Sequence, residues 1–304
     1  MNPMTDNINR RLKWLGLPLG AALVCALLRR WQLGTAFEEE TGLAIRNAPA
    51  SVVLACLLVM SAAWLMIQAA HETANPKGQW DLVFLDTGEM VYPGLLIVSA
   101  LMALAAVPFL LRSGMQQWQD YRAAAAADLQ LPSDNGVLTI ATAIGSLLSF
   151  VGLLQIGRDG LHAGRRGKGG FSAALPGVAG CMWLMESFRA HAANPVQWDY
   201  APLLLAIVCG MLFYMDFAGI SAGSARPQRF LWMAAMTVVL SGTALVSAWT
   251  EKTWADVLLL LAQSLAAAAV LWRMPPLLEH PPRPRGIPIP RGETSIQEEE
   301  PIDE

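Results

Sequence analysis

The chain has 304 residues, of which 54% are hydrophobic and only 15% are charged. Soluble chains carry about 25% charged residues, so this composition excludes an ordinary soluble domain. The formal net charge of −3 lacks the basic excess that is typical of nucleic-acid-binding proteins, so we expect no nucleic acid partner.

The apolar residues gather in blocks of about 20, the length a helix needs to cross a hydrocarbon core of about 30 Å. In lipid the backbone must satisfy its own hydrogen bonds, so each block is predicted to be a helix. The predicted fold class is all-α, a polytopic transmembrane helix bundle of about eight spans over residues 14–272, in contact with the lipid bilayer. The predicted spans are 14–28, 51–70, 93–111, 136–156, 171–190, 202–221, 230–249 and 254–272.

Three segments outside the spans differ from them in composition. Residues 1–13 are polar and are predicted to form an N-terminal tail. Residues 273–304 are rich in Pro and then acidic, and they cannot bury enough apolar surface to stay ordered. The connector 112–135 contains a helix-prone stretch that Gln, Asp and Arg interrupt. We expect this stretch either to lie flat on the membrane surface or to form a solvated helical connector.

One motif occurs twice. Trp64-Leu65-Met66 recurs 119 positions later as Trp183-Leu184-Met185, and Asn-Pro and Gln-Trp-Asp follow in both copies. The loop residues of the motif are Asn75, Pro76, Trp80 and Asp81 in the first copy and Asn194, Pro195, Trp198 and Asp199 in the second. These loops suggest a substrate site, but a physical role is favoured: Pro ends a helix, Trp suits the headgroup zone, and Asp199 can cap the next span.

The order of the spans predicts where the two motif loops lie. Three spans separate the loops, so they are expected at opposite faces of the membrane. Residues 14–111 and 136–221 would then form an inverted duplication of a three-helix unit, an arrangement common among transporters. Residues 230–272 would add a C-terminal helical hairpin. The alternative is a chance match between Ala- and Leu-rich segments.

The distribution of Lys and Arg predicts the orientation. Of the 21 basic residues, 14 fall on one side of the membrane if the N-terminus is cytoplasmic, and 7 fall on the other side. Both termini are therefore predicted to be cytoplasmic. Arg29, Arg30 and Arg46 oppose this orientation, because they fall on the predicted outer side.

Charged residues within spans are costly and suggest function. Glu186 and Asp216 lie within predicted spans, separated by roughly 13 Å along the membrane normal at ~1.5 Å per residue in a core of ~30 Å. They are therefore not expected to form a direct pair. Glu186 is expected to pair with Arg189, three residues along the same helix. Asp216 lacks such a neighbour, so its partner should come from another span.

No sequence motif indicates an enzyme, a cofactor or a metal site. The four cysteines stand alone inside apolar blocks and are interpreted as small core residues. The sequence has no H-E-x-x-H, G-x-S-x-G or phosphate-loop pattern. We therefore expect no catalytic residue, no metal and no cofactor. The glutamines within the spans, Gln68, Gln155 and Gln263, are predicted to bond neighbouring helices.

The second half of the chain carries a resemblance. The residues concerned are Leu175-Pro176, Trp183-Leu184, Arg189, Asn194-Pro195, Tyr200, Met211-Leu212, Tyr214, Ser221-Ala222-Gly223, Arg226 and Phe230, with a looser match over Leu33–Pro49. This pattern resembles multi-pass membrane proteins of clostridial Firmicutes, a group with no assigned function. The resemblance implies a bacterial plasma membrane protein. We expect a transporter-like or sensory module or, alternatively, a membrane-anchored interaction protein with a membrane or cytoplasmic protein partner.

Overall fold

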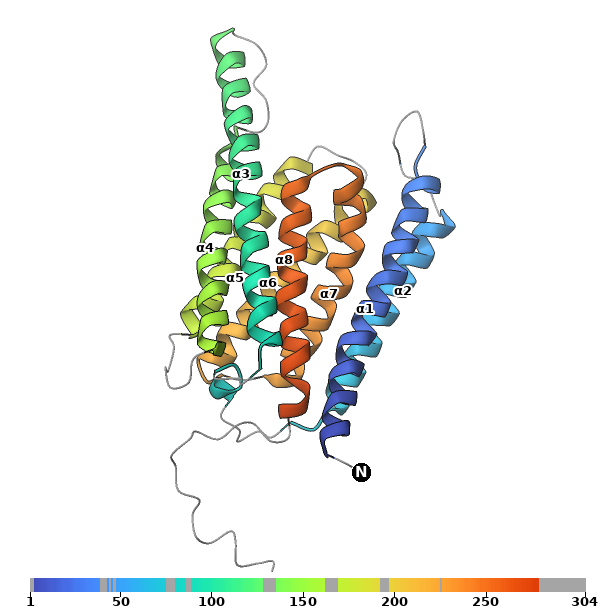
Figure 1. Cartoon of the computed structure of the whole chain (residues 1–304). Helices are drawn as coiled ribbons and strands as arrows, with labels where there is room; N and C mark the ends of the chain where they lie inside the picture. The colour runs from blue at the N-terminus through green and yellow to red at the C-terminus, as the bar shows by residue number, and fades with distance from the viewer. Residues whose placement is uncertain are drawn as a thin grey trace, which may run out of the picture.

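The computed structural model describes residues 3–38, 43, 45, 48–74, 80–85, 89–127, 135–161, 169–191, 197–224 and 226–278. Helices make up its architecture (Figure 1). In chain order they are α1 (Pro3–Thr35), α2 (Pro49–His71), the short η1 (Trp80–Leu82), α3 (Val91–Ala126), α4 (Val137–Leu161), α5 (Gly169–His191), α6 (Gln197–Ser221), α7 (Pro227–Thr250), α8 (Trp254–Arg273) and the short η2 (Pro275–Leu277). The predicted all-α helix bundle is confirmed.

Seven of the described helices are long and apolar enough to cross a membrane, namely α1, α2, α3, α4, α6, α7 and α8. The protein is therefore an integral membrane protein. The remaining helix, α5, has 23 residues and packs between α4 and α6. It carries Glu186 and Arg189 near its C-terminal end, and these charges reduce its mean hydropathy.

Six helices, α3 to α8, form a closed ring. Each packs against the next along the chain, and α8 packs against α3 to complete the circle. Figure 1 shows α3 and α8 in front of α5 and α6, with α4 and α7 at the two sides. The hairpin of α1 and α2 lies outside this ring and packs mainly against α7. Helix α7 is consequently covered on most of its surface.

Small residues allow the ring helices to approach closely. A Cβ atom on Gly145 of α4 would lie 3.2 Å from Ala179 of α5, and one on Gly242 of α7 would lie 2.8 Å from Ala22 of α1. Close backbone contact of this kind is how helices associate within lipid, where hydrophobic burial gives no driving force between them.

Replacing Gly152 with Ala should destabilise the bundle. A Cβ atom there would lie 2.4 Å from the backbone oxygen of Ser172, which cannot move without shifting α5. Overpacking of this kind costs about 1–3 kcal/mol. Gly20→Ala is the matched control, because nothing lies within 4 Å of its added Cβ. The thermal stability of the detergent-solubilised protein should fall for Gly152→Ala alone, and equal behaviour of the two variants would contradict the α4–α5 packing.

The two ends of the bundle have different contents. At one end lie the start of α1, the end of α2, Glu89 just before α3, and the end of α8 (Figure 1). We call this the Glu89 end. At the opposite end lie the end of α1, the start of α6 and the α7–α8 turn, and we call this the Asp199 end. The first and last described residues thus lie at the same end, and the two motif loops lie at opposite ends, as the span order predicts.

The described structure extends further toward both termini than the sequence suggested. Helix α1 begins at Pro3, so residues 3–13 are its first turns rather than a separate tail. At the other terminus Arg273, Met274 and Leu278 are buried, so the predicted tail cannot begin at residue 273. Residues 281–304 lie outside the described residues. The C-terminal extension packs against the bundle, whereas the start of α1 is held by the ion pairs of Arg10 with Glu72 and of Arg11 with Glu89. Composition reveals neither contact.

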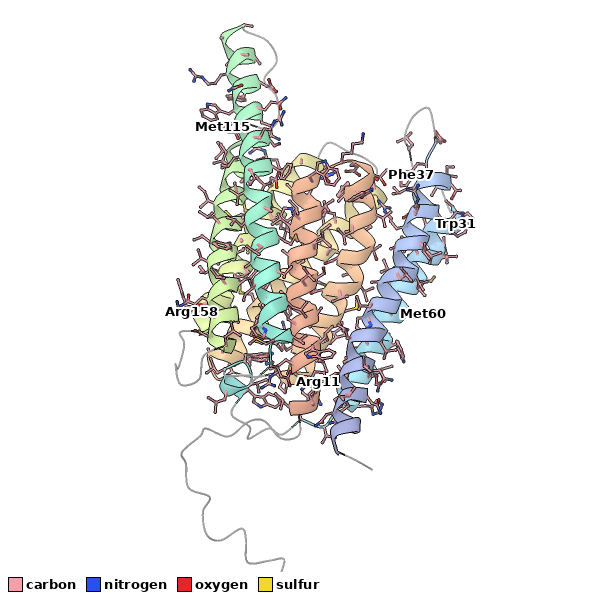
Figure 2. The ribbon with its side chains drawn as sticks, in the orientation of Figure 1. Arg11, Trp31, Phe37, Met60, Met115 and Arg158 are labelled. Atoms are coloured by element: carbon pink, nitrogen blue, oxygen red, sulfur yellow. The ribbon has the colours of Figure 1, made fainter. Side chains whose placement is uncertain are left out.

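The prediction that part of the connector 112–135 lies flat on the membrane is wrong. Helix α3 continues without a break to Ala126 and has 36 residues, which is about 54 Å at ~1.5 Å per residue. Its C-terminal part projects past the other helices at the Asp199 end, with Met115 exposed on it (Figures 1 and 2). The alanines after Trp118 favour a helix and allow α3 to continue beyond its apolar part. This arrangement corresponds to the second expectation for this segment, a solvated helical connector.

The inverted duplication stays a prediction. Helices α4, α5 and α6 pack consecutively, whereas α3 packs chiefly against α4 and α8 and the α1–α2 hairpin packs against α7. The two proposed three-helix units therefore differ in their packing, although their motif loops lie at opposite ends.

Candidate functional site

A cavity lies inside the ring, near the middle of the helices that line it. Its volume is about 40 Å³. One water molecule needs about 10–15 Å³ on this measure, so the cavity has room for about three. The polar or aromatic lining residues are Thr142, Ser146, Ser149, Trp183, Tyr214 and Gln263, contributed by α4, α5, α6 and α8.

Hydroxyl groups form one wall of the cavity. Ser146 Oγ donates to the Ala103 carbonyl of α3 at 2.6 Å, and Thr142 Oγ1 donates to Leu138 of its own helix at 3.0 Å. No hydrogen bond of the Ser149 hydroxyl is found among the described residues, although Ser149 is only 8% exposed. A buried hydroxyl usually has a partner, so Ser149 offers the cavity a free donor and acceptor.

The opposite wall is held by bonds between helices. Gln263 of α8 donates from Nε2 to Ser241 Oγ of α7 at 2.8 Å and to the Ala206 carbonyl of α6 at 3.2 Å. Ser99 Oγ of α3 donates to the Ala262 carbonyl of α8 at 2.6 Å. The predicted interhelical role of Gln263 is confirmed, and these bonds fix the shape of the cavity.

Trp183 connects the cavity to the Asp199 end. Its indole Nε1 donates to Asp256 Oδ1 at 2.8 Å, and Asp256 lies in the first turn of α8. Trp183 belongs to the repeated Trp-Leu-Met segment. Its place in the motif is visible in the sequence, whereas its pairing with a carboxylate of another helix is not.

A buried arginine organises the Asp199 end. Arg29 of α1 has no exposed surface. Its guanidinium donates to Ser247 Oγ at 2.8 Å and to Gln32 Oε1 at 2.6 Å. It also donates to the Asp199 backbone carbonyl, and its Nη2 lies 3.5 Å from Asp199 Oδ1. One side chain thus joins α1, α6 and α7, and this pairing neutralises a charge that opposed the predicted orientation.

Two arginines organise the Glu89 end. Arg11 of α1 donates to both carboxylate oxygens of Glu89, at 2.9 and 2.7 Å. The Arg273 Nη1 atom lies 3.6 Å from the same carboxylate, and Arg273 Nε donates to the Val83 carbonyl at 3.2 Å. The Arg11 guanidinium also stacks 5.4 Å from the centre of the Trp272 ring. These groups join α1 and α8 to the segment just before α3, and Figure 2 labels Arg11 at this end of the bundle.

The two ends share one arrangement. Arg273 binds the backbone two residues after the first Gln-Trp-Asp, and Arg29 binds the backbone and carboxylate of Asp199 in the second. Helix α1 supplies Arg11 at one end and Arg29 at the other, about 27 Å apart at ~1.5 Å per residue. Arginine pairing therefore joins α1 to the other helices at both ends of the bundle.

A second pair of buried polar groups lies at the Glu89 end. Tyr92 is fully buried and Asp159 is 7% exposed. Neither the Tyr92 hydroxyl nor Asp159 Oδ2 has a hydrogen-bond partner among the described residues. Tyr92 packs on the backbone beside Asp159, since a Cβ atom on Gly160 would lie 3.2 Å from its ring. Asp159 is not among the candidate residues predicted from the sequence, because it lies just past the predicted fourth span.

The predicted site residues Glu186 and Arg189 lie at the C-terminal end of α5. Glu186 Oε1 lies 3.3 Å from the Thr139 hydroxyl of α4, which also donates to Gln117 Oε1 of α3 at 2.9 Å. Glu186 therefore contacts α4 directly and is linked to α3 through Thr139, outside the cavity lining. Its pairing with Arg189 stays a prediction.

Asp216 lies in the last turns of α6 and is paired from another helix, as its sequence surroundings suggested. Asp216 Oδ2 lies 3.1 Å from Arg229 Nε of α7. The N–H group is not aligned with this oxygen, so the contact is an ion pair rather than a good hydrogen bond. Glu186 and Asp216 approach opposite ends of the bundle, and the structure does not bring them together.

The motif residues are only partly described. Trp80 is buried in the core rather than exposed to the headgroup zone, so that expectation is wrong for the first copy. Asp199 lies inside the first turn of α6 and pairs with Arg29. Asn75, Pro76, Asn194 and Pro195, and the side chains of Asp81 and Trp198, lie outside the described residues.

The other two span glutamines also bond neighbouring helices. Gln68 of α2 accepts from Lys13 of α1 at 3.0 Å, and Gln155 of α4 accepts from Ser172 of α5 at 2.9 Å. Within the described part of the chain, no group of three or more His, Cys, Asp or Glu side chains could hold a metal ion.

Comparison with known proteins adds no family to this picture. No protein-family model, no curated protein and no solved structure matches the chain.

Proposed function

We propose that this protein is a small-solute carrier of the bacterial plasma membrane, with its termini in the cytoplasm. The observation that carries the proposal is the cavity in the middle of the six-helix ring, whose largely apolar wall includes the Ser149 hydroxyl and its neighbouring hydroxyl groups. Most hydroxyl groups of the lining are used in bonds to the backbone or to neighbouring helices, whereas the Ser149 hydroxyl is left over for a polar solute.

The ion pairs at the two ends support a carrier rather than a pore. A carrier must expose its site to one side at a time, so it needs a closure on each side of the site. The Arg29–Asp199 pair and the Arg11–Glu89–Arg273 cluster occupy these two places. Both clusters use α1, which lies outside the ring, so movement of the α1–α2 hairpin would affect both closures.

The proposed orientation follows the charge distribution. The Glu89 end holds the larger share of Lys and Arg, as cytoplasmic ends do. Arg29 is paired with Asp199, so one of the three arginines that oppose this orientation is neutralised. The resemblance to membrane proteins of clostridial Firmicutes supports the proposed bacterial location.

A second role as an interaction protein is favoured by one observation. The part of α3 that projects past the bundle exposes Met115 and Trp118, with 61% and 42% of their surfaces accessible. A partner protein at the Asp199 end could bind this projecting part of α3. Loss of residues 115–126 should then abolish partner binding while leaving the cavity intact.

Thiol labelling tests the carrier directly. With the four native cysteines replaced, Ser149→Cys should react with a membrane-impermeant thiol reagent in both right-side-out and inside-out vesicles. Leu154→Cys is the matched control on the same helix, where a 38% exposed side chain faces away from the cavity. It should stay unreactive, because a thiol in lipid meets neither water nor reagent. Reaction of Ser149→Cys from only one face, or from neither, would contradict the carrier.

A further inference from the structure

The cavity has an acidic neighbourhood at the Asp199 end. Burial of its carboxyl group raises the pKa of Glu251, and the charges of Asp199 and Asp256 raise it further, whereas His191 and Arg29 act in the opposite direction. These three carboxylates therefore lie near one another. Arg29 is already engaged with Asp199, and Lys252 is next to Glu251 in the chain, so the three carboxyl groups outnumber these two permanent cations.

This acidic group is connected to the cavity by direct bonding. Asp256 accepts a hydrogen bond from Trp183, and Trp183 lines the cavity. A cation moving from the Asp199 end toward the cavity would therefore meet carboxylates before it reached the ring of Trp183. An anion would be repelled along the same approach.

The cavity itself favours a small cation that donates hydrogen bonds. No Lys, Arg or His lines it. Ser149 contributes an unpartnered hydroxyl oxygen, and Trp183 and Tyr214 contribute aromatic rings, whose faces attract cations. A volume of about 40 Å³ admits a ligand of a few heavy atoms at most. Hard metal ions prefer six or more oxygen ligands, which this lining does not supply.

A buried carboxylate is also present toward the other end. Asp159 lies ten residues beyond Ser149 on α4, about 15 Å along the helix at ~1.5 Å per residue. Its Oδ2 atom and the nearby Tyr92 hydroxyl lack hydrogen-bond partners among the described residues. Arg11 and Arg273 share Glu89 at that end, so the buried carboxyl group of Asp159 lies on this side of the cavity at an end that is rich in arginine.

We propose that the ligand of the cavity is a small primary ammonium ion, such as ammonium or methylammonium, which enters past Glu251 and Asp256. The N–H groups bond Ser149, and the positive charge lies against the rings of Trp183 and Tyr214. This inference rests on the proposed carrier function, because it assigns the class of solute to the same cavity.

Charged thiol reagents test the inference without a known substrate. In a neutral detergent, Ser149→Cys would be treated with a cationic trimethylammonium-type and with an anionic sulfonate-type methanethiosulfonate. Each rate is divided by the rate of the same reagent with a free thiol. Electrostatic steering changes association rates by about 10- to 1,000-fold, and we expect the cationic reagent to be favoured by about tenfold. Methylammonium chloride should slow labelling, compared with sodium chloride at equal ionic strength.

Two variants link the preference to the carboxylates. Asp256→Asn should reduce the preference for the cationic reagent, but it also disturbs the bond to Trp183. Glu251→Gln avoids this problem, since Glu251 lies in the α7–α8 turn and much of its surface is exposed, although neighbouring groups partly desolvate its carboxyl group. The variant should reduce the preference in a normally folded protein. Glu38→Gln, also exposed but before α2, is the matched control and should change nothing.

The outcomes separate the two proposals. A rate ratio near one, or labelling that methylammonium leaves unchanged, overturns the ammonium assignment. The carrier proposal survives that result if Ser149→Cys still reacts from both faces of the vesicles. If Ser149→Cys reacts with neither reagent, both the ammonium assignment and the carrier proposal are overturned.

Discussion

Asp199→Ala should lower the apparent melting temperature of the detergent-solubilised protein by about 10 °C. Breaking a buried ion pair from one side costs about 3–5 kcal/mol, because the other charge stays buried without a partner. Arg29 has no exposed surface, so its charge cannot reach water. We expect about 3 kcal/mol, since Asp199 itself is 34% exposed, and each kcal/mol shifts the melting temperature of a larger domain by about 2–4 °C.

The reverse change should cost less. Arg29→Met removes the buried charge and leaves an Asp199 carboxylate that can contact solvent. Combining Arg29→Met with Asp199→Ala should therefore recover part of the stability that Asp199→Ala loses alone. A double variant as unstable as the sum of both single variants would contradict coupling of the two charges. Size-exclusion profiles of heated samples measure all three variants on one scale.

The spans could be predicted from the sequence because they depend on local composition. A block of about 20 apolar residues is a helix in lipid whatever its neighbours are. The predicted turn between the last two spans is confirmed, with α7 ending at Thr250 and α8 beginning at Trp254. Helix ends were less predictable, because the first turns of α1 and the last part of α3 are polar and lie beyond the apolar blocks.

The order of helices around the ring could not be predicted from composition. Within lipid, the apolar faces of helices pack by shape. Small residues such as Gly145 and Gly152 indicate that another helix lies close by, but they do not indicate which helix it is. The position of α1 and α2 outside the ring, against α7, follows from such contacts. The inverted repeat suggested equivalent units of three helices, and the observed packing of α3 against α8 differs from that expectation.

The candidate site was only partly predictable for the same reason. Charges within spans suggest functional residues, and this criterion points to Glu186 and Asp216. Both residues lie near the ends of their helices. The cavity is lined by Ser149, Tyr214 and Trp183, residues that are common in membrane helices and carry no distinguishing spacing. Arg29 was interpreted as a topological charge, yet it is buried against Asp199. Only the three-dimensional arrangement relates the two motif copies to arginines more than 150 residues away in the chain.

Glu89→Gln should open the cavity toward the Glu89 end. Glu89 accepts from Arg11 and lies beside Arg273, whose side chains are only 16% and 9% exposed. Neutralising the carboxylate leaves two positive charges close together with no shared counterion, so the closed arrangement loses stability. If the closed state loses about 1.4 kcal/mol of stability, the equilibrium between closed and open states shifts about tenfold toward the open state. The rate of thiol labelling from the Glu89 side is proportional to the population of that open state.

We therefore expect Ser149→Cys to react about ten times faster from the Glu89 face when Glu89→Gln is added, with no gain from the Asp199 face. Gln keeps the shape of Glu and can still accept one bond from Arg11, so the variant should fold. Asp216→Asn is the matched control, because its partner Arg229 is 43% exposed and surface ion pairs contribute about 0–1 kcal/mol. Equal acceleration from both faces would indicate general loosening of the bundle. Unchanged rates from both faces would show that the Glu89 cluster joins α1, α3 and α8 without controlling access to the cavity.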